Sequence, residues 1–234
     1  MPLPHDPYLL AALFGIVLFI FFVLLFYPPQ PLRRRMPTLL VHGSPARVVA
    51  ERLTGFFFFG ILPLALLYSR LPSFDPSSLG LVFPPSRWVI PSVFFWVVLI
   101  LAVSRVAGRP ANLEQYPQMR KVRWTLPMVM LNAATWALYL AGYEFLFRGL
   151  LLFPFLSRLG TAGTLIFNLL LYALAHLHKG WREVAGSFVF GTILVLATIY
   201  SGSLMISYLS HLVLALSNGF FAARATKTNG HVPA

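Results

Sequence analysis

The sequence predicts an all-α protein: a polytopic bundle of about seven transmembrane helices, with the N-terminus outside and the C-terminus in the cytoplasm. Of the 234 residues, 58% are hydrophobic and only 10% are charged, whereas a typical soluble domain is about one quarter charged. The mean hydropathy is +0.77. Apolar runs close to the ~20 residues that cross a bilayer recur along the chain and are separated by proline, glycine and basic residues.

The apolar segments can be taken in order along the chain. The first is preceded by no Lys or Arg and is too long for a signal-peptide core, so we interpret it as a retained helix. The second is expected to kink at Pro63. The fourth is longer than a straight span needs and is expected to tilt or to bend near Gly142 and Gly149. The segments expected to cross the bilayer are residues 7–27, 53–69, 88–106, 126–156, 164–177, 184–200 and 204–223.

The basic residues predict the orientation. Residues 33–35, directly after the first span, are three arginines, and most of the 18 lysines and arginines fall on the same side of the bundle. Only Arg70, Arg87 and Arg158 are expected on the other side, and Arg148 lies inside a span. Because cytoplasmic loops collect Lys and Arg, this asymmetry predicts the N-terminus outside and the C-terminus in the cytoplasm.

Composition also limits the domain organisation and the classes of function. We divide the chain into N-terminal helices and loops (residues 1–125), a helical core (residues 126–223) and a flexible C-terminal tail (residues 224–234). The net charge of +12 resides in short loops between apolar runs, so nucleic acid is not expected as a partner. With no cysteine, disulfides, thiolate metal sites and a cysteine nucleophile are excluded.

The fourth apolar segment carries one acidic and one basic side chain near its middle, at the expected depth of the hydrocarbon core of the bilayer. A charge at the bilayer centre costs roughly 2.5–3.5 kcal/mol. Glu144 and Arg148 are four residues apart, so they share one helix face and can pair with each other away from lipid. An ion pair that only fixes helix packing is the structural alternative.

Two other spans also carry ionisable groups. Asn168, Tyr172 and His176 recur every four residues and form one polar stripe. The last span carries His211, with Asn218 two turns further on. An ion pair that only fixes helix packing would not require histidines on two further spans. These residues therefore indicate a functional site inside the bundle.

The residue types suit peptide hydrolysis. A carboxylate with an imidazole can activate water, and a second imidazole with an amide can donate hydrogen bonds to an oxyanion. Glu144, His176 and His211 also match a zinc set of two histidines and one carboxylate. The sequence has no HExxH motif, so zinc ranks second, and no other cofactor is expected.

These residues resemble the CPBP family of intramembrane proteases, which includes the type II CAAX prenyl proteases and bacteriocin-processing or immunity proteins. The family motifs are EExxxR, FxxxH and HxxxN. The first is matched by residues 143–148, which read YEFLFR and continue into Gly149 as in bacterial members. Residues 172–176 match the second with tyrosine for phenylalanine, and the third begins at His211. The resemblance covers about residues 138–218.

The resemblance implies an all-helical membrane bundle enclosing a cavity, with the leading glutamate and the second-motif histidine activating water. Tyr143 stands where that glutamate belongs, and a phenol with a pKa near 10 is a poor base. Ala215 stands where the third motif has asparagine. Asn218 is the nearest replacement amide, on the face of His211 but about 10 Å away along the helix axis.

The resemblance implies an intramembrane endopeptidase in a bacterial inner membrane that cleaves a membrane-associated or lipidated protein near its C-terminus. Glu144 and His176 would handle the water, and Arg148 would orient Glu144. His211 and Asn218 would bind the oxyanion, and the remaining site residues would have supporting roles. Because two motif positions differ, a peptide-binding immunity or scaffold protein with impaired hydrolysis is the alternative, followed by a proton-coupled transporter. The supporting residues are Arg148, Tyr143, Tyr172 and Asn168.

Overall fold

The computed structural model describes residues 6–29, 43–120 and 122–228 of the chain, and these ranges are helical without any strand. This confirms the predicted all-α class. The α-helices are α1 (Pro7–Phe26), α3 (Pro45–Phe56), α4 (Leu62–Arg70), α5 (Val89–Val106), α6 (Pro110–Leu113), α7 (Leu126–Glu144), α8 (Phe153–His176), α9 (Trp181–Ser201) and α10 (Met205–Thr228). Short 3₁₀ or π turns are η2 (Phe57–Ile61), η3 (Pro76–Leu79), η4 (Ser86–Trp88), η5 (Phe145–Leu150) and η6 (Leu177–Lys179).

Six helical segments in the described part of the chain are long and apolar enough to cross a membrane. The protein is therefore a polytopic helical bundle, as predicted, although the predicted span of residues 126–156 is not among the six. The six segments are Pro7–Phe26, Pro45–Arg70, Ser86–Val106, Phe153–His176, Trp181–Ser201 and Met205–Lys227.

The predicted fourth span is divided because its helix does not continue. Helix α7 has 19 residues and ends at Glu144, where the chain widens into the π-helix η5. A turn follows, and α8 begins at Phe153. The bend expected near Gly142 and Gly149 thus begins between them, at Phe145. Helix α8 is itself two pieces that meet at Gly160, whose φ of 64° breaks the helix.

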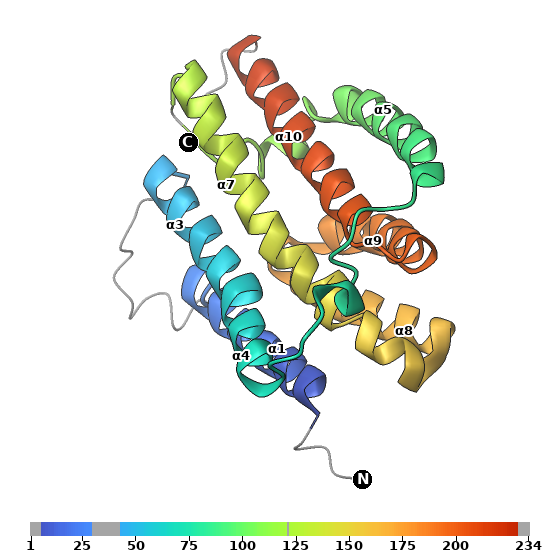
Figure 1. Cartoon of the computed structure of the whole chain (residues 1–234). Coiled ribbons are helices and arrows are strands. Elements are labelled where there is room, and N and C mark those ends of the chain that lie inside the picture. The colour runs from blue at the N-terminus through green and yellow to red at the C-terminus, as the bar shows by residue number, and fades with distance from the viewer. Residues whose placement is uncertain (1–5, 30–42, 121, 229–234) are drawn as a thin grey trace.

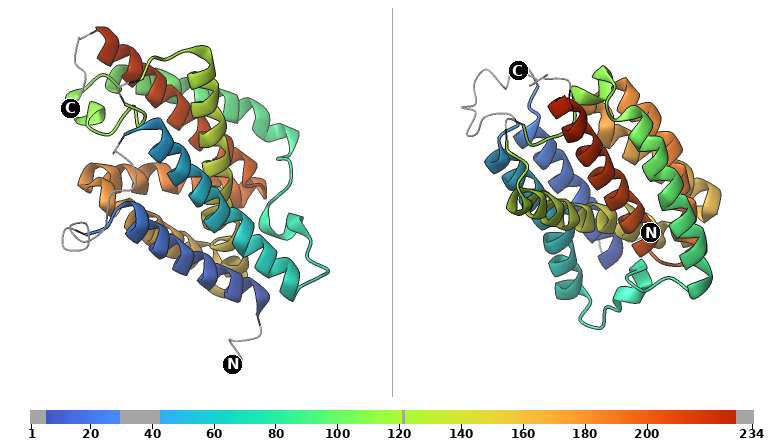
Figure 2. Two further views of the ribbon diagram at one scale, coloured as in Figure 1. Left: turned by 90° about the vertical axis from the view of Figure 1, so that its left-hand side faces the viewer. Right: turned by 90° about the horizontal axis from the view of Figure 1, so that it is seen from above.

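Helix α7 occupies the middle of the bundle, with α3 on one side and α10 on the other (Figures 1 and 2). Glycines let it approach its neighbour closely. A Cβ built on Gly60 of η2 would lie 3.1 Å from the Cα of Gly142, and one built on Gly142 would lie 3.0 Å from the backbone of Phe56. Small residues at such crossings allow close backbone packing inside a membrane.

The second span contains the predicted irregularity. Between α3 and α4 the chain forms the π-helix η2, and Pro63 follows as an early residue of α4. Proline has no N–H and its ring clashes with the carbonyl four residues earlier, which here is that of Phe59. The wider π turn lies where this carbonyl must be accommodated.

The described start of α1 and the end of α10 lie at opposite ends of the bundle (Figures 1 and 2). Which end faces the cytoplasm stays a prediction. Helix α10 continues to Thr228, so residues 224–228, expected to belong to a flexible tail, are helical. The three arginines at residues 33–35 and the last six residues, 229–234, lie outside the described residues.

Candidate active site

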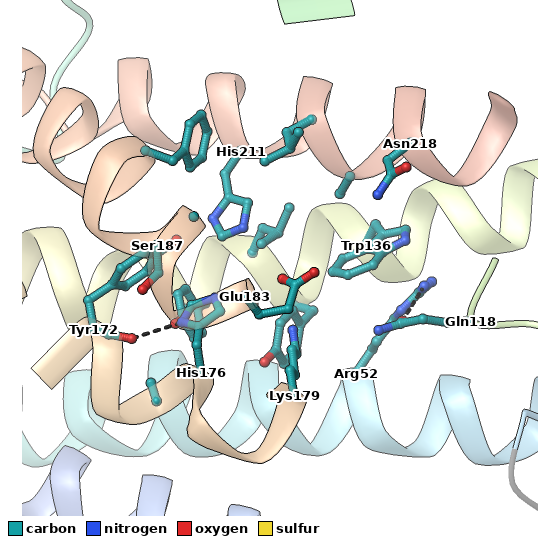
Figure 3. A pocket seen from close by; sticks show the side chains of 18 of the residues that line it. Arg52, Gln118, Trp136, Tyr172, His176, Lys179, Glu183, Ser187, His211 and Asn218 are labelled. Carbon is teal, nitrogen blue, oxygen red and sulfur yellow. Dashed lines mark hydrogen bonds between the residues drawn. The ribbon is translucent and has the colours of Figure 1, made fainter. Parts of the chain in front are cut away.

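A cavity of about 220 Å³ lies among α1, α3, α7, α8, α9 and α10. Figure 3 shows side chains from α3, α7, α8, α9 and α10 directed into it. Five of the predicted site residues line the cavity, and they come from three different helices: Tyr143, Tyr172, His176, His211 and Asn218. The other three predicted residues, Glu144, Arg148 and Asn168, are fully buried and are not part of its lining.

Glu144 lies behind the cavity wall, between two basic side chains. Its Oε1 is 2.6 Å from Nδ1 of His211, and its Oε2 is 3.3 Å from Nε of Arg148. Because an ionised carboxylate only accepts hydrogen bonds, Nδ1 of His211 carries the proton of this bond. The other ring nitrogen, Nε2, is the one left to act on a ligand. Glu144 therefore fixes the tautomer and orientation of His211.

Arg148 is held by more than Glu144. Its guanidinium carbon lies 4.2 Å from the ring centroid of Tyr172, a cation–π contact. The side chain is completely buried. The predicted ion pair on one helix face thus forms across the junction of α7 and η5, and Tyr172 of α8 adds an aromatic contact to the guanidinium.

His176 is fixed by its own helix. Its Nδ1 lies 2.8 Å from the carbonyl oxygen of Tyr172, one turn earlier. A carbonyl only accepts, so Nδ1 donates and Nε2 carries no proton in the neutral ring. The ring packs at 4.6 Å from that of Tyr172. Both histidines of the cavity therefore have defined tautomers with Nε2 as the reactive nitrogen.

Tyr143 occupies the motif position of a glutamate and lines the cavity. Its ring packs at 4.6 Å from Phe147 and meets the ring of His211 edge-on at 5.8 Å. The buried hydroxyl has no hydrogen-bond partner among the described residues. A buried hydroxyl without a partner is costly, so Tyr143 offers a donor to a water or a ligand carbonyl in the cavity.

Asn168 and Asn218 have structural partners. The amide of Asn168 donates to the carbonyls of Phe147 and Leu151, at 2.6 and 3.2 Å, which lie in or directly after the π-helix η5. Asn218 exchanges two hydrogen bonds with Asn112 of α6, at 2.9 and 3.2 Å. Asn168 therefore satisfies irregular backbone, and the amide of Asn218 is engaged although it borders the cavity.

The alternative prediction of a zinc site requires Glu144, His176 and His211 to be ligands of one zinc ion. Across residues 6–29, 43–120 and 122–228, no three His, Asp or Glu side chains form a group that could hold a metal ion. Glu144 contacts His211, but it does not border the cavity that His176 lines. The zinc set therefore has no geometric support.

Sequence reasoning missed five charged residues that line the cavity: Glu51, Arg52, Lys179, Arg182 and Glu183. Arg52 is 2% exposed, donates to Thr135 at 2.9 Å and lies 4.0 Å over the ring of Trp136. Glu51 and Glu183 also line the cavity. The chain has only six acidic residues, so their rarity was a signal that could have drawn attention to these two carboxylates.

The family comparison agrees with the motifs. Residues 123–217 match a family model described as 'Type II CAAX prenyl endopeptidase Rce1-like'. Comparison with the curated proteins and with the solved structures gave no match. The matched range contains α7, η5, α8, α9 and the His211 turn of α10. Residues 123–217 are therefore similar to the type II CAAX prenyl endopeptidases, the group that the three motifs also indicated.

Proposed function

We propose that the protein is an intramembrane endopeptidase that cleaves a membrane-associated or lipidated protein near its C-terminus. The match of residues 123–217 to a protease family supports peptidase chemistry in general. The observation that carries the proposal is the convergence of His176 and His211, from α8 and α10, on one cavity inside the bundle. Each imidazole has its Nδ1 hydrogen bonded, so each turns Nε2 to a ligand.

The two histidines have different surroundings and hence different roles. His211 is bonded through Nδ1 to the carboxylate of Glu144, which holds the ring in place, and we assign its Nε2 the contact with the oxyanion of the tetrahedral intermediate, which it makes as a donor when the ring carries both protons. His176 is bonded to a neutral carbonyl and is the ring suited to accept a proton or to orient water. Glu144 and Arg148 act through His211 and are positioning residues.

Tyr143 and Ala215 change which hydrogen-bond donors the cavity lining offers to the oxyanion. The phenol of Tyr143 donates a hydrogen bond where the family has a carboxylate, and Ala215 donates none. The hydroxyl of Tyr143 can therefore take over the second oxyanion contact that the family asparagine provides. Asn218 is not needed for this contact, since it is bonded to Asn112.

The test is cleavage in proteoliposomes. Purified protein is reconstituted with a fluorescent peptide carrying a lipidated cysteine near its C-terminus, and products are identified by mass spectrometry. His176→Ala and His211→Ala are expected to lower kcat at least 100-fold, the usual contribution of acid–base and oxyanion groups. Thr192→Ala is the control, because that exposed hydroxyl bonds only within α9.

A binding protein without hydrolysis is the alternative that Tyr143 favours. It predicts that the wild-type protein retains the intact peptide and releases no fragment, with equal affinity in the two histidine variants. Cleavage by the wild type that both alanine variants reproduce at the same rate would contradict the assignment of this cavity.

A further inference from the structure

The cavity lacks the carboxylate that its motif position would supply, and another acid reaches into it. Glu144 is enclosed by His211 and Arg148, outside the lining. Of the acidic residues that line the cavity, Glu51 accepts a hydrogen bond from the hydroxyl of Tyr27. Glu183 lies on the first turn of α9, and Figure 3 shows its carboxylate pointing into the cavity.

A tight connection brings Glu183 close to the catalytic region. Helix α8 ends at His176, the short turn η6 follows, and Gly180, with φ 97°, caps the start of α9. The N–H of Glu183 bonds to the carbonyl of Gly180 at 3.1 Å. Glycine allows this left-handed backbone, so the chain reverses and α9 packs against α8. The carboxylate and His176 therefore border the same cavity from adjoining helices.

Glu183 is also chemically available. The residue is half-buried, and its carboxylate forms no hydrogen bond or ion pair within the described part of the chain, unlike the carboxylates of Glu51 and Glu144. Burial raises the pKa of the Tyr116 phenol at the cavity rim, and the negative charge of Glu183 raises it further. Lys179 and Arg182 line the same cavity, but neither forms an ion pair with this carboxylate in the described part of the chain.

We propose that Glu183 is the general base of this peptidase and replaces the glutamate that Tyr143 displaced. The inference rests on the proposed function. Glu183 takes a proton from water as the water oxygen bonds to the peptide carbonyl carbon, which gives a tetrahedral oxyanion held by His211. The C–N bond then breaks, and Glu183 returns the proton to the leaving nitrogen. The products are a carboxylic acid and an amine, so atoms and charge balance.

The experiment compares Glu183→Gln with Glu114→Gln in the proteoliposome assay. Both changes remove one carboxylate, but Glu114 is an exposed loop residue that is not part of the cavity lining. Glu183→Gln is expected to lower kcat 100-fold or more with KM unchanged, because glutamine keeps the shape but cannot accept the proton. Glu114→Gln is expected to cleave at the wild-type rate.

A second variant distinguishes loss of a base from loss of structure. Glu183→Asp keeps a carboxylate on a side chain one methylene shorter and is expected to cleave at least tenfold faster than Glu183→Gln. Thermal unfolding in detergent checks that each variant folds. If Glu183→Gln cleaves like the wild type, only the inference fails. If the wild type binds the peptide but never cleaves it, the proposed function fails as well.

A separate feature lies outside this cavity, where α7 begins and α10 ends. A groove of about 1240 Å³ runs between these helices and the loop residues 117–120 and 122–125. No Asp or Glu is among its lining residues. Its apolar side includes Val129 and Phe220, which are 43% and 60% exposed. The basic residues that line it are Arg120, Arg123, Arg224 and Lys227.

We infer that this groove binds an anionic phospholipid. The apolar side runs along two helices and suits an acyl chain, and the cations cluster where the span Met205–Lys227 ends, at the depth of lipid phosphates. Such basic pockets between transmembrane helices favour anionic headgroups. The complementarity between a negative headgroup and a basic cluster with no carboxylate among the lining residues selects this occupant over a neutral lipid.

The test measures lipid retained on the detergent-solubilised protein by native mass spectrometry, with phosphatidylglycerol against phosphatidylcholine. Phosphatidylglycerol is expected to bind at least tenfold more tightly. Arg123→Gln and Lys227→Gln are each expected to weaken it about fivefold, the effect of one basic residue near an anionic surface. The control, Arg87→Gln, changes an exposed arginine outside the groove. Equal binding of both lipids, or competition by millimolar inorganic phosphate alone, would overturn the lipid assignment.

Discussion

At the scale of single residues, the burial of Glu144 decides what it can do. Adjacent helical residues point about 100° apart, so when Tyr143 faces the cavity Glu144 faces away from it. There the carboxylate meets His211 and Arg148 with no exposed surface. A buried charge is tolerated when it is paired. Glu144 is therefore suited to hold a histidine in place rather than to approach a substrate.

The pair of Glu144 and Arg148 gives a stability prediction. Arg148→Met removes the cation but leaves the carboxylate buried, so we expect a loss of about 3–5 kcal/mol in the free energy of unfolding. Glu144→Gln combined with Arg148→Met removes both charges and is expected to recover more than half of that loss. Unfolding in mixed micelles followed by circular dichroism measures both variants.

The control for that experiment is Arg70→Met, which removes an exposed arginine at the end of α4 and is expected to change the free energy of unfolding by less than about 0.5 kcal/mol. A double variant as unstable as Arg148→Met would mean that the charges themselves are not the reason for the loss.

At the scale of helices, glycines and π turns determine how α7 meets its neighbours. Helix α7 crosses η2 where Gly60 and Gly142 face each other with almost no space for a side chain. At its end the π-helix η5 leaves carbonyls that Asn168 of α8 satisfies. Irregular backbone in a membrane protein is tolerated where buried protein groups satisfy it. These contacts fix the rotation of α7 and hence which residues face the cavity.

This crossing predicts a difference between two glycines. Gly142→Ala would place a methyl group 3.0 Å from the backbone of Phe56, which cannot move aside as a side chain can. We expect a loss of about 1–3 kcal/mol from overpacking. Gly219→Ala on α10 meets nothing within 4 Å and is expected to stabilise the helix by about 0.5–1 kcal/mol. Thermal unfolding of the two variants in one detergent compares them, and equal effects would contradict the close crossing.

The helix boundaries show which parts of the fold could be predicted from the sequence and which could not. Hydrophobic runs and prolines predicted most of the membrane helices, because length and composition determine a span locally. Gly142 and Gly149 indicated that the segment of residues 126–156 could bend, but not that its helix widens into a π-helix at Phe145, because that π-helix is supported by Asn168 from a later helix. Contacts between segments far apart in sequence have no local signature.

At the scale of the whole molecule, the site also depends on contacts between distant segments that the sequence does not reveal. The sequence predicted that polar residues on three helices belong together, since each is costly in lipid and they lie on inward faces. It did not predict that Glu144 contacts His211 while Tyr143 borders the cavity, nor that Glu51 and Glu183 line it. Those outcomes depend on helix rotation and on loops that only the assembled bundle positions.

The orientation of the whole bundle gives the last prediction, and the absence of native cysteine makes it easy to test. Ser73 lies in the exposed loop after α4, and Gln115 lies in the exposed loop after α6. With the N-terminus outside, Ser73→Cys is expected to react with a membrane-impermeant maleimide in intact cells, and Gln115→Cys only after the membrane is permeabilised. The positive loops before α7 and after α8 favour this orientation. The cysteine-free wild type provides a zero background, and labelling of the two variants in the opposite order would reverse the orientation of the bundle.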